Sequence, residues 1–118
     1  SKPKKFSRAY ILINEKNEFL VRKRSSKGIL ASMLEVPNDE WVEKKSLLRR
    51  DVIVNKIQKK LIRKGDLNYS FSHFDLYVEI FYKKIRKIDY PKNKWLNINK
   101  YSNSQLPTVM KKILEIMM

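Results

Sequence analysis

Residues 76–83 constrain the fold of this chain more than any other segment, because aliphatic side chains alternate there with aromatic or charged ones. In an extended chain every second side chain points to the same side. One face would therefore carry Leu76, Val78, Ile80 and Tyr82. The pattern predicts a long β-strand, which has to pair with others in a sheet.

Three other segments have the composition of strands. Residues 7–14 and 18–24 are apolar stretches separated by a polar turn, so we expect them to form a hairpin. Residues 94–98, Lys-Trp-Leu-Asn-Ile, predict a short strand after a turn that contains Pro91.

Two segments show the apolar spacing of a helix. The first is expected from Lys45 to Lys64, with Gly65 as its C-terminal cap. Its apolar face would carry Leu47, Val54, Ile57 and Leu61. The second starts near Pro107, a residue that suits the first turn of a helix. Its apolar stripe consists of Val109, Met110, Ile113, Leu114 and Met117.

The order strands, helix, strands, helix predicts one α+β domain over residues 1–118, with a mixed or antiparallel sheet and helices against it. Residues 1–6 are interpreted as a linker or chain edge before the first strand. A chain of 118 residues can bury a core without disulfide or metal support.

The charge of the chain is strongly positive, with 27 Lys and Arg against 12 Asp and Glu, a net +15. Such a charge attracts polyanions, and nucleic acid is the first candidate. The alternative is a biased composition rich in Lys, Ile and Asn, with part of the charge on solvated surface. No apolar run has the length of a membrane span and no signal-peptide pattern opens the chain, so no membrane partner is expected.

The residue types of the chain leave few routes to catalysis. It has no cysteine, one histidine and two glycines, which excludes thiolate metal sites, cysteine nucleophiles and glycine-rich phosphate loops within this chain. The nearest approach to a metal-binding group is an acidic cluster made of Glu35, Asp39, Glu40 and Glu43. Because these acids precede the first predicted helix, we interpret them as complementing its positive end.

Several motifs, in order, resemble a known family. Lys-Gly-Ile-Leu at 27–30 runs into Leu-Glu-Val-Pro at 34–37, Phe-Ser-His-Phe follows at 71–74, and Leu-Pro-x-x-Met-x-Lys closes the chain at 106–112. This series resembles the C-terminal, Nudix-like domain of MutY, the A/G-specific adenine DNA glycosylase. The resemblance covers most of residues 7–117 and implies a mixed β-sheet packed between helices, an α/β/α sandwich.

The chain departs from this family at informative positions. Leu34 stands where the family usually has Trp, and Asn38-Asp39 replaces a Gly-Gly pair. The first Glu and the Arg-Glu pair of an active Nudix hydrolase would fall on Lys44 and on Val52-Ile53. Lysine and aliphatic side chains do not hold a hard cation, which takes oxygen ligands. We therefore expect no catalytic residues and no metal site in this domain.

The resemblance implies a function in base excision repair. The domain would read 8-oxoguanine opposite adenine in double-stranded DNA, without being catalytic itself. Excision would belong to an N-terminal glycosylase domain of the same parent protein, which carries an iron–sulfur cluster and would be absent from this chain. This domain itself would bind no cofactor, and the implied location is the bacterial cytoplasm, at the nucleoid.

The residues expected to contact the lesion are Phe71, Ser72 and His73, which lead into the long predicted strand. The resemblance implies that Ser72 contacts the oxidised base, since a hydroxyl both donates and accepts hydrogen bonds. His73 would position the loop or donate to a phosphate or the base. Phe71 would wedge or pack the loop, and burial in the core is the more ordinary role of a phenylalanine.

Two alternatives stay open at this point. One is a Nudix nucleotide pyrophosphohydrolase with an aberrant site, and the other is a basic nucleic-acid-binding module without preference for a lesion.

A basic stripe is also expected on the outer side of the first helix, formed by Arg49, Lys56, Lys60 and Arg63. Such a stripe is typical of a solvated helix surface, and contact with DNA phosphates is the alternative.

Overall fold

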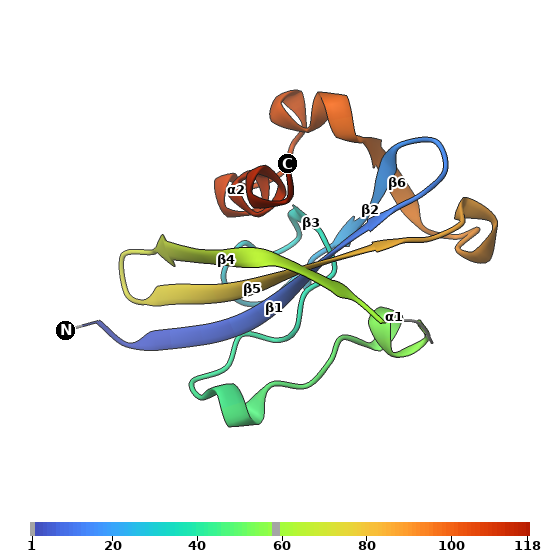
Figure 1. The fold of residues 1–118 in the computed structure, drawn as a ribbon. Helices are drawn as coiled ribbons and strands as arrows, with labels where there is room; N and C mark the ends of the chain where they lie inside the picture. Colours follow the sequence, from blue (N-terminus) through green and yellow to red (C-terminus); the bar gives the residue numbers. More distant parts are fainter. Residues whose placement is uncertain (1, 58–59) are drawn as a thin grey trace.

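The computed structural model describes residues 2–57 and 60–118, which form a six-stranded mixed sheet with helices beside it (Figure 1). The strands are β1 (Lys4–Ile13), β2 (Glu18–Lys23), β3 (Leu34–Glu35), β4 (Ile62–Ser70), β5 (Asp75–Lys84) and β6 (Lys94–Asn97). Their order is β3-β2-β1-β5-β4, with β6 paired to β2. The α+β architecture and the mixed sheet expected from the sequence are thus confirmed.

The parallel pair β1–β5 forms the centre of the sheet, with Ala9 opposite Ile80. All other paired strands are antiparallel. Leu76, Val78 and Ile80 are buried on one face of β5, as their alternation predicts. The hairpin of β1 and β2 and the short strand β6 also confirm the sequence prediction. However, β1 begins at Lys4, so residues 4–6 pair with β5 and are not a linker.

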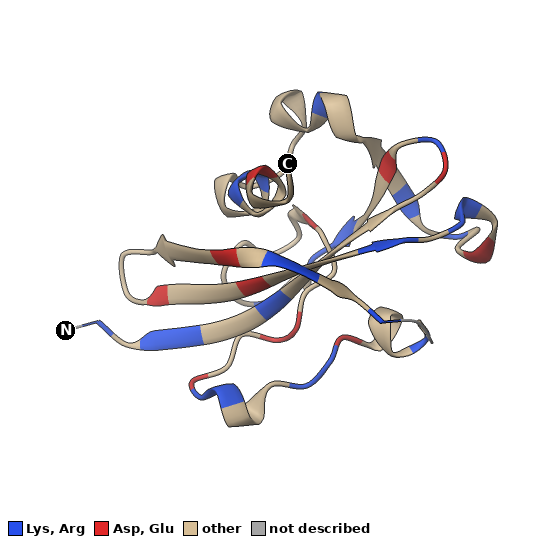
Figure 2. Ribbon diagram, in the orientation of Figure 1, with Lys and Arg blue, Asp and Glu red and all other residues tan. Residues whose placement is uncertain are grey.

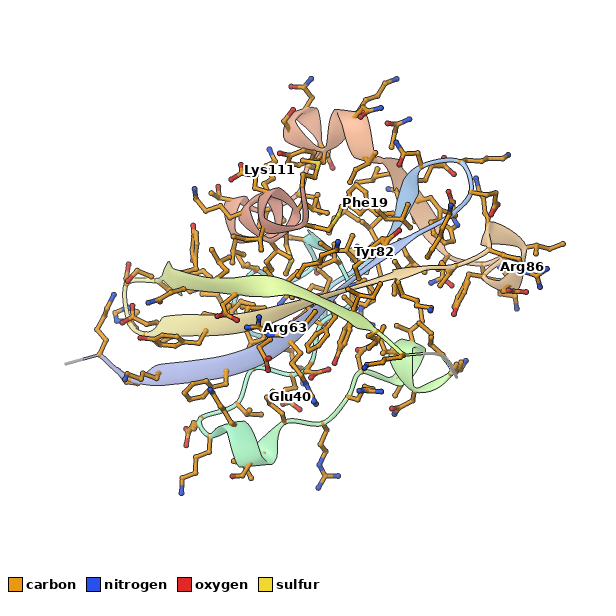
Figure 3. All side chains as sticks on the ribbon, viewed as in Figure 1. Phe19, Glu40, Arg63, Tyr82, Arg86 and Lys111 are labelled. Carbon is orange, nitrogen blue, oxygen red and sulfur yellow. The ribbon has the colours of Figure 1, made fainter. Side chains whose placement is uncertain are left out.

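Helix α2 (Thr108–Met117) covers this face of the sheet (Figure 1). The predicted apolar stripe is the buried side of the helix, and Pro107 lies at its N-cap. Phe19, fully buried on β2, lies between the sheet and the C-terminal segments (Figure 3). Two 3-10 turns, Lys87–Asp89 and Ile98–Asn103, connect β5, β6 and α2.

The prediction of one helix from Lys45 to Lys64 is wrong. Residues 45–47 form a 3-10 turn, α1 (Val52–Asn55) is a single turn, and β4 begins at Ile62. Val52, Ile53 and Val54 are β-branched and favour a helix weakly. Beyond them, pairing with β5 determines the structure, so tertiary contacts override the helical spacing.

Gly65 is not a helix cap. It lies at a register shift in β4, with a φ of 155°, beneath α2. A Cβ at this position would lie 2.9 Å from Cγ2 of Ile116. Glycine is therefore required by a β-bulge and by the close approach of α2.

The second face of the sheet is covered mostly by irregular chain. The side chain of Val54 in α1 packs against Tyr10, Leu12 and Leu20, which form a second core. Residues 36–42, which precede α1 in the chain, run beside β1. Isolated β-bridges join Phe6 to Val42 and Ala9 to Asn38. No helix among residues 2–57 and 60–118 is long and apolar enough to cross a membrane.

Candidate functional site

The loop that joins β4 to β5, residues 71–74, carries all the site residues expected from the sequence. The amide of Phe71 donates to the carbonyl of Phe74 over 2.9 Å, which closes a tight turn. Ser72 and His73 form the tip of this turn and are exposed. The fold therefore presents a hydroxyl and an imidazole at one end of the antiparallel pair β4–β5.

Phe71 is half-buried in an aromatic cluster beneath the loop. Its ring centroid lies 4.9 Å from those of Tyr69 and Phe74 and 5.6 Å from that of Trp41. Trp41 and Phe74 also contact each other edge to face. Such pairs stabilise packing beyond the area they bury, so Phe71 anchors the loop to the core.

Lys2, two residues before β1, braces the base of the same loop. The ammonium of Lys2 donates to the hydroxyl of Ser70 and to the carbonyl of Phe71, each over 2.9 Å, and lies 3.1 Å from Asp75. A hydrogen bond from Ser70, followed by one from Lys2, lowers the pKa of the Asp75 carboxyl. Ser70 and Asp75 are paired residues of β4 and β5, so this cluster ties three chain segments together.

A network of arginines and carboxylates lies on the far side of Trp41. Arg22 donates to Glu35 over 2.8 Å and makes a two-pronged contact with Asp51 over 2.7 and 2.8 Å. Arg24 donates to the other oxygen of Glu35 over 2.7 Å, and Asn38 donates to that oxygen over 2.9 Å. These residues line a cavity of about 510 Å³.

The charges in this network neutralise one another. Burial alone would lower the pKa of Arg22, but hydrogen bonds with Asp51 and Glu35 outweigh it and raise the pKa. Bidentate arginine–carboxylate contacts of this kind are the stronger and more specific ion pairs. The sequence holds a signal for this network, since Arg22 and Arg24 are two residues apart in the expected strand 18–24 and would share a face.

Asp39 joins the network to the second core. It is fully buried, pairs with Arg8, and accepts hydrogen bonds from the Tyr10 hydroxyl and the Asp51 amide, each over 2.8 Å. Burial first, and the bond to Asp39 second, raise the pKa of Tyr10. Asp39 therefore fastens the chain after Pro37 to β1.

The acidic cluster expected at a helix start has another role. Because the long helix does not form, Glu35 and Asp39 have no helix dipole to complement, and arginines are their partners instead. Glu40 and Glu43 are exposed, and Glu40 is visible below the sheet in Figure 3.

The residues present do not fit a magnesium site of the Nudix type. Lys44 and Ile53 stand where such a site has glutamates, and neither side chain supplies an oxygen ligand. The carboxylates of Glu35, Asp39 and Asp51 are already bound by arginines. Among the residues that the structure describes, no group of three or more His, Cys, Asp or Glu side chains could hold a metal ion.

The basic stripe expected on the first helix does not exist as a surface, because its helix does not form. Arg49 and Lys60 lie in irregular chain, and Lys56 ends α1. Arg63 lies in β4 and pairs with Asp66 and Glu79 (Figure 3). Lysine and arginine are instead distributed over all parts of the chain (Figure 2).

Comparison with known proteins defines the family. The sequence matches the NUDIX domain over residues 8–116, most of its length, so the chain belongs to the Nudix family. Comparison with curated protein sequences finds no match.

Solved structures with the same fold fall into different functional groups. A MutT protein from Methanosarcina mazei Go1 shares 18% identity, with a TM-score of 0.70 over 99% of this chain and 94% of that chain. The C-terminal domain of mouse MUTYH, solved with human PCNA, shares 16% identity, with a TM-score of 0.72 over 95% and 86%. NrtR from Shewanella oneidensis, solved with a 27mer DNA, shares 7%, with a TM-score of 0.66 over 95% and 59%. At such identities the likeness shows the fold, so function has to be argued from the site.

Proposed function

We propose that this chain is the lesion-recognition domain of an adenine DNA glycosylase and reads 8-oxoguanine opposite adenine. The observation that carries the proposal is the exposed pair Ser72 and His73 at the tip of a braced, two-stranded loop. Loops on a rigid support are the usual place for binding residues. Phe71 would hold the loop in place through its ring contacts and would lie beside the oxidised base.

The chemistry of the damaged base fits this loop. Guanine presents N7 as an acceptor in the major groove, whereas the 8-oxo base carries a hydrogen on N7 and a carbonyl at C8. A reader then needs an acceptor and a donor close together, and a serine hydroxyl supplies both. The exposed imidazole of His73 adds a second polar group within the same turn.

The partner in this proposal is double-stranded DNA, and a separate glycosylase domain of the same parent protein would flip out and excise the adenine. The net charge of +15 favours a polyanionic partner. The structural likeness to the C-terminal domain of mouse MUTYH agrees with a role in DNA repair.

A nucleotide pyrophosphohydrolase is the second candidate, and membership of the Nudix family together with the MutT-like neighbours favours it. The carboxylates argue against a hydrolase, because Glu35, Asp39 and Asp51 are already paired with arginines and are not free to bind a metal ion. Mg²⁺-dependent release of phosphate or pyrophosphate from nucleotides would support this candidate over the lesion reader.

NMR titration of the labelled domain with matched duplexes tests the proposal. A lesion reader shows shifts at Ser72 and His73 with an 8-oxoG:A duplex that a G:A duplex does not produce. Ser72→Ala should remove this difference, while Ser46→Ala, at an exposed serine far from the loop in sequence, should preserve it. Equal shifts with both duplexes, spread over the lysines, would leave a basic module without lesion preference.

A further inference from the structure

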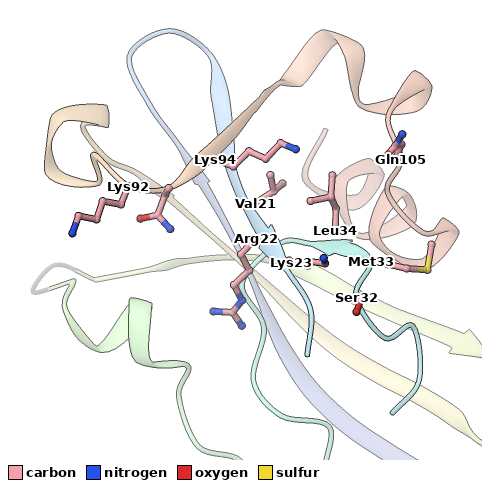
Figure 4. Close-up of a pocket in the computed structure, with 10 residues that line it drawn as sticks. Val21, Arg22, Lys23, Ser32, Met33, Leu34, Lys92, Lys94 and Gln105 are labelled. Carbon is pink, nitrogen blue, oxygen red and sulfur yellow. The ribbon is translucent and has the colours of Figure 1, made fainter. Parts of the chain in front are cut away.

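A cavity that the proposed function does not use lies at the opposite edge of the sheet from the 71–74 loop. It has a volume of about 710 Å³ and is bounded by β2, by the chain at residues 32–34, by the turn before β6, and by Gln105 (Figure 4). Neither the lesion loop nor the arginine–carboxylate network accounts for it. Its chemistry is set by three lysines, Lys23, Lys92 and Lys94.

The three lysines line one cavity without opposite charges beside them. No Asp or Glu lines it, and within the described part of the chain none of the three ammonium groups forms a salt bridge. Lys94 pairs with Val21 across β2 and β6, and Lys23 lies two residues further along β2, so both side chains leave the same face of the sheet. Like charges so placed repel one another. An anion in the cavity would relieve this repulsion.

Arg22, the fourth cation that lines the cavity, is already paired with carboxylates. Arg22 contacts Glu35 and Asp51, and in Figure 4 its guanidinium points away from the lysines. The three lysines are spread along the cavity, with Lys92 at one end and Gln105 at the other. Ser32 and Gln105 add polar groups at the rim, and Val21 and Leu34 line the cavity beside them.

We propose that this cavity, the β2–β6 groove, binds the phosphate backbone of a DNA strand without reading its sequence. No aromatic ring lines the groove, so a base would have nothing to stack on. Lysine binds phosphate as a point charge on a flexible stem, which suits a backbone contact better than a shaped site for a free nucleotide. The groove is separate from the lesion loop and contributes affinity to any duplex, damaged or not.

The salt dependence of binding to an unmodified duplex tests the groove independently of lesion reading. Lys23→Gln/Lys92→Gln/Lys94→Gln should reduce the slope of log K against log salt by about 2 to 3, since each phosphate contact contributes about 0.9. The matched control, Lys16→Gln/Lys44→Gln/Lys112→Gln, removes the same charge from other exposed sites and should change the slope by less than about 1. Equal changes in both triple variants would overturn the proposal.

A second measurement on the unmutated protein identifies the source of the phosphate. Amides of residues 21–23 and 92–94 should shift in NMR spectra with an unmodified duplex at concentrations where pyrophosphate and a mononucleotide have no effect. Saturable shifts with pyrophosphate or the mononucleotide, and none with DNA, would overturn the assignment to a strand. Ser72→Ala should leave the salt slope unchanged, so the groove and the lesion loop succeed or fail separately.

Discussion

The indole of Trp41 packs against the ring of Phe71 with centroids 5.6 Å apart, and this contact joins the 71–74 loop to the arginine–carboxylate network. On its other side Trp41 lies under the guanidinium of Arg24, with 4.3 Å from Cζ to the ring centroid. Its Nε1 donates to Asn38 over 2.9 Å. The loop is therefore held from below by an aromatic ring whose own position is fixed by polar contacts.

Replacing Trp41 should loosen the loop as well as the fold. Trp41→Ala removes a half-buried ring and is expected to cost about 2–3 kcal/mol in the free energy of unfolding. Trp41→Phe keeps a ring but loses the hydrogen bond to Asn38, with an expected cost of about 1 kcal/mol. Urea unfolding measures both values. Amide exchange at Ser72 and His73 should accelerate in Trp41→Ala, and unchanged exchange there would contradict the coupling.

Gly65 should tolerate a side chain poorly. Gly65→Ala forces an L residue into a φ of 155° and places its Cβ against Ile116, so we expect a loss of about 1–2 kcal/mol of stability. Gly28→Ala is the matched control, because Gly28 also has positive φ but nothing within 4 Å of its Cβ position. Thermal or urea unfolding should rank Gly65→Ala as the more destabilised variant. The reverse order would show that the approach of α2 does not constrain this position.

Lys2 should act on the loop with little effect on global stability. Its contacts are exposed, so Lys2→Ala should change the free energy of unfolding by less than about 1 kcal/mol. The pKa of Asp75 should rise toward its ordinary value, because one of the two hydrogen bonds that lower it is lost. A carboxyl with a lowered pKa stabilises the fold above its unfolded pKa and loses this contribution as pH falls through its folded pKa.

The Asp75 contribution should therefore persist at neutral pH and disappear on acidification below about pH 4. An NMR titration of the Asp75 side chain in the unmutated protein and in Lys2→Ala measures the shift. Lys16→Ala, at the hairpin between β1 and β2, serves as the control for loss of one positive charge. An identical Asp75 titration in all three proteins would contradict the bracing role of Lys2.

Arg22 should be the most costly cation to remove. Arg22→Gln leaves the largely buried Asp51 without its arginine and Glu35 with Arg24 alone, and breaking such pairs costs about 2–4 kcal/mol. Arg86→Gln breaks a pair with Asp89 that is largely exposed, and should cost less than about 1 kcal/mol. Equal stabilities of the two variants in urea would show that the network is not held by Arg22.

The strands and the last helix could be predicted because their apolar periodicity and their burial agree. In β5 the alternating residues Leu76, Val78 and Ile80 are those that the core buries. Residues 45–64 carry helical spacing, yet from Ile62 onward the chain pairs with β5, a partner that no local pattern in that segment reveals. The same limit applies to Gly65, whose bulge depends on where α2 packs.

The polar network was missed for a related reason. Glu35 belongs to β3 and Asp51 caps α1, and they meet Arg22 only through the pairing of β2 with β3 and the turn before α1. The segment Phe71-Ser72-His73, in contrast, stands out as a local motif, and the structure places it in the turn between β4 and β5. Local motifs therefore located the loop, whereas contacts between distant segments determine what supports it.

The most direct test of lesion reading is the ratio of binding constants for an 8-oxoG:A duplex and a G:A duplex, measured for the unmutated protein and for Ser72→Ala at one salt concentration. If Ser72 makes one good contact with the oxidised base, the unmutated protein should prefer the lesion by about 1–3 kcal/mol, and Ser72→Ala should lose that preference. The three-lysine groove variant should bind both duplexes more weakly at an unchanged ratio. A ratio of one for the unmutated protein, or the same preference in Ser72→Ala, would contradict the assignment of this loop as the reader of 8-oxoguanine.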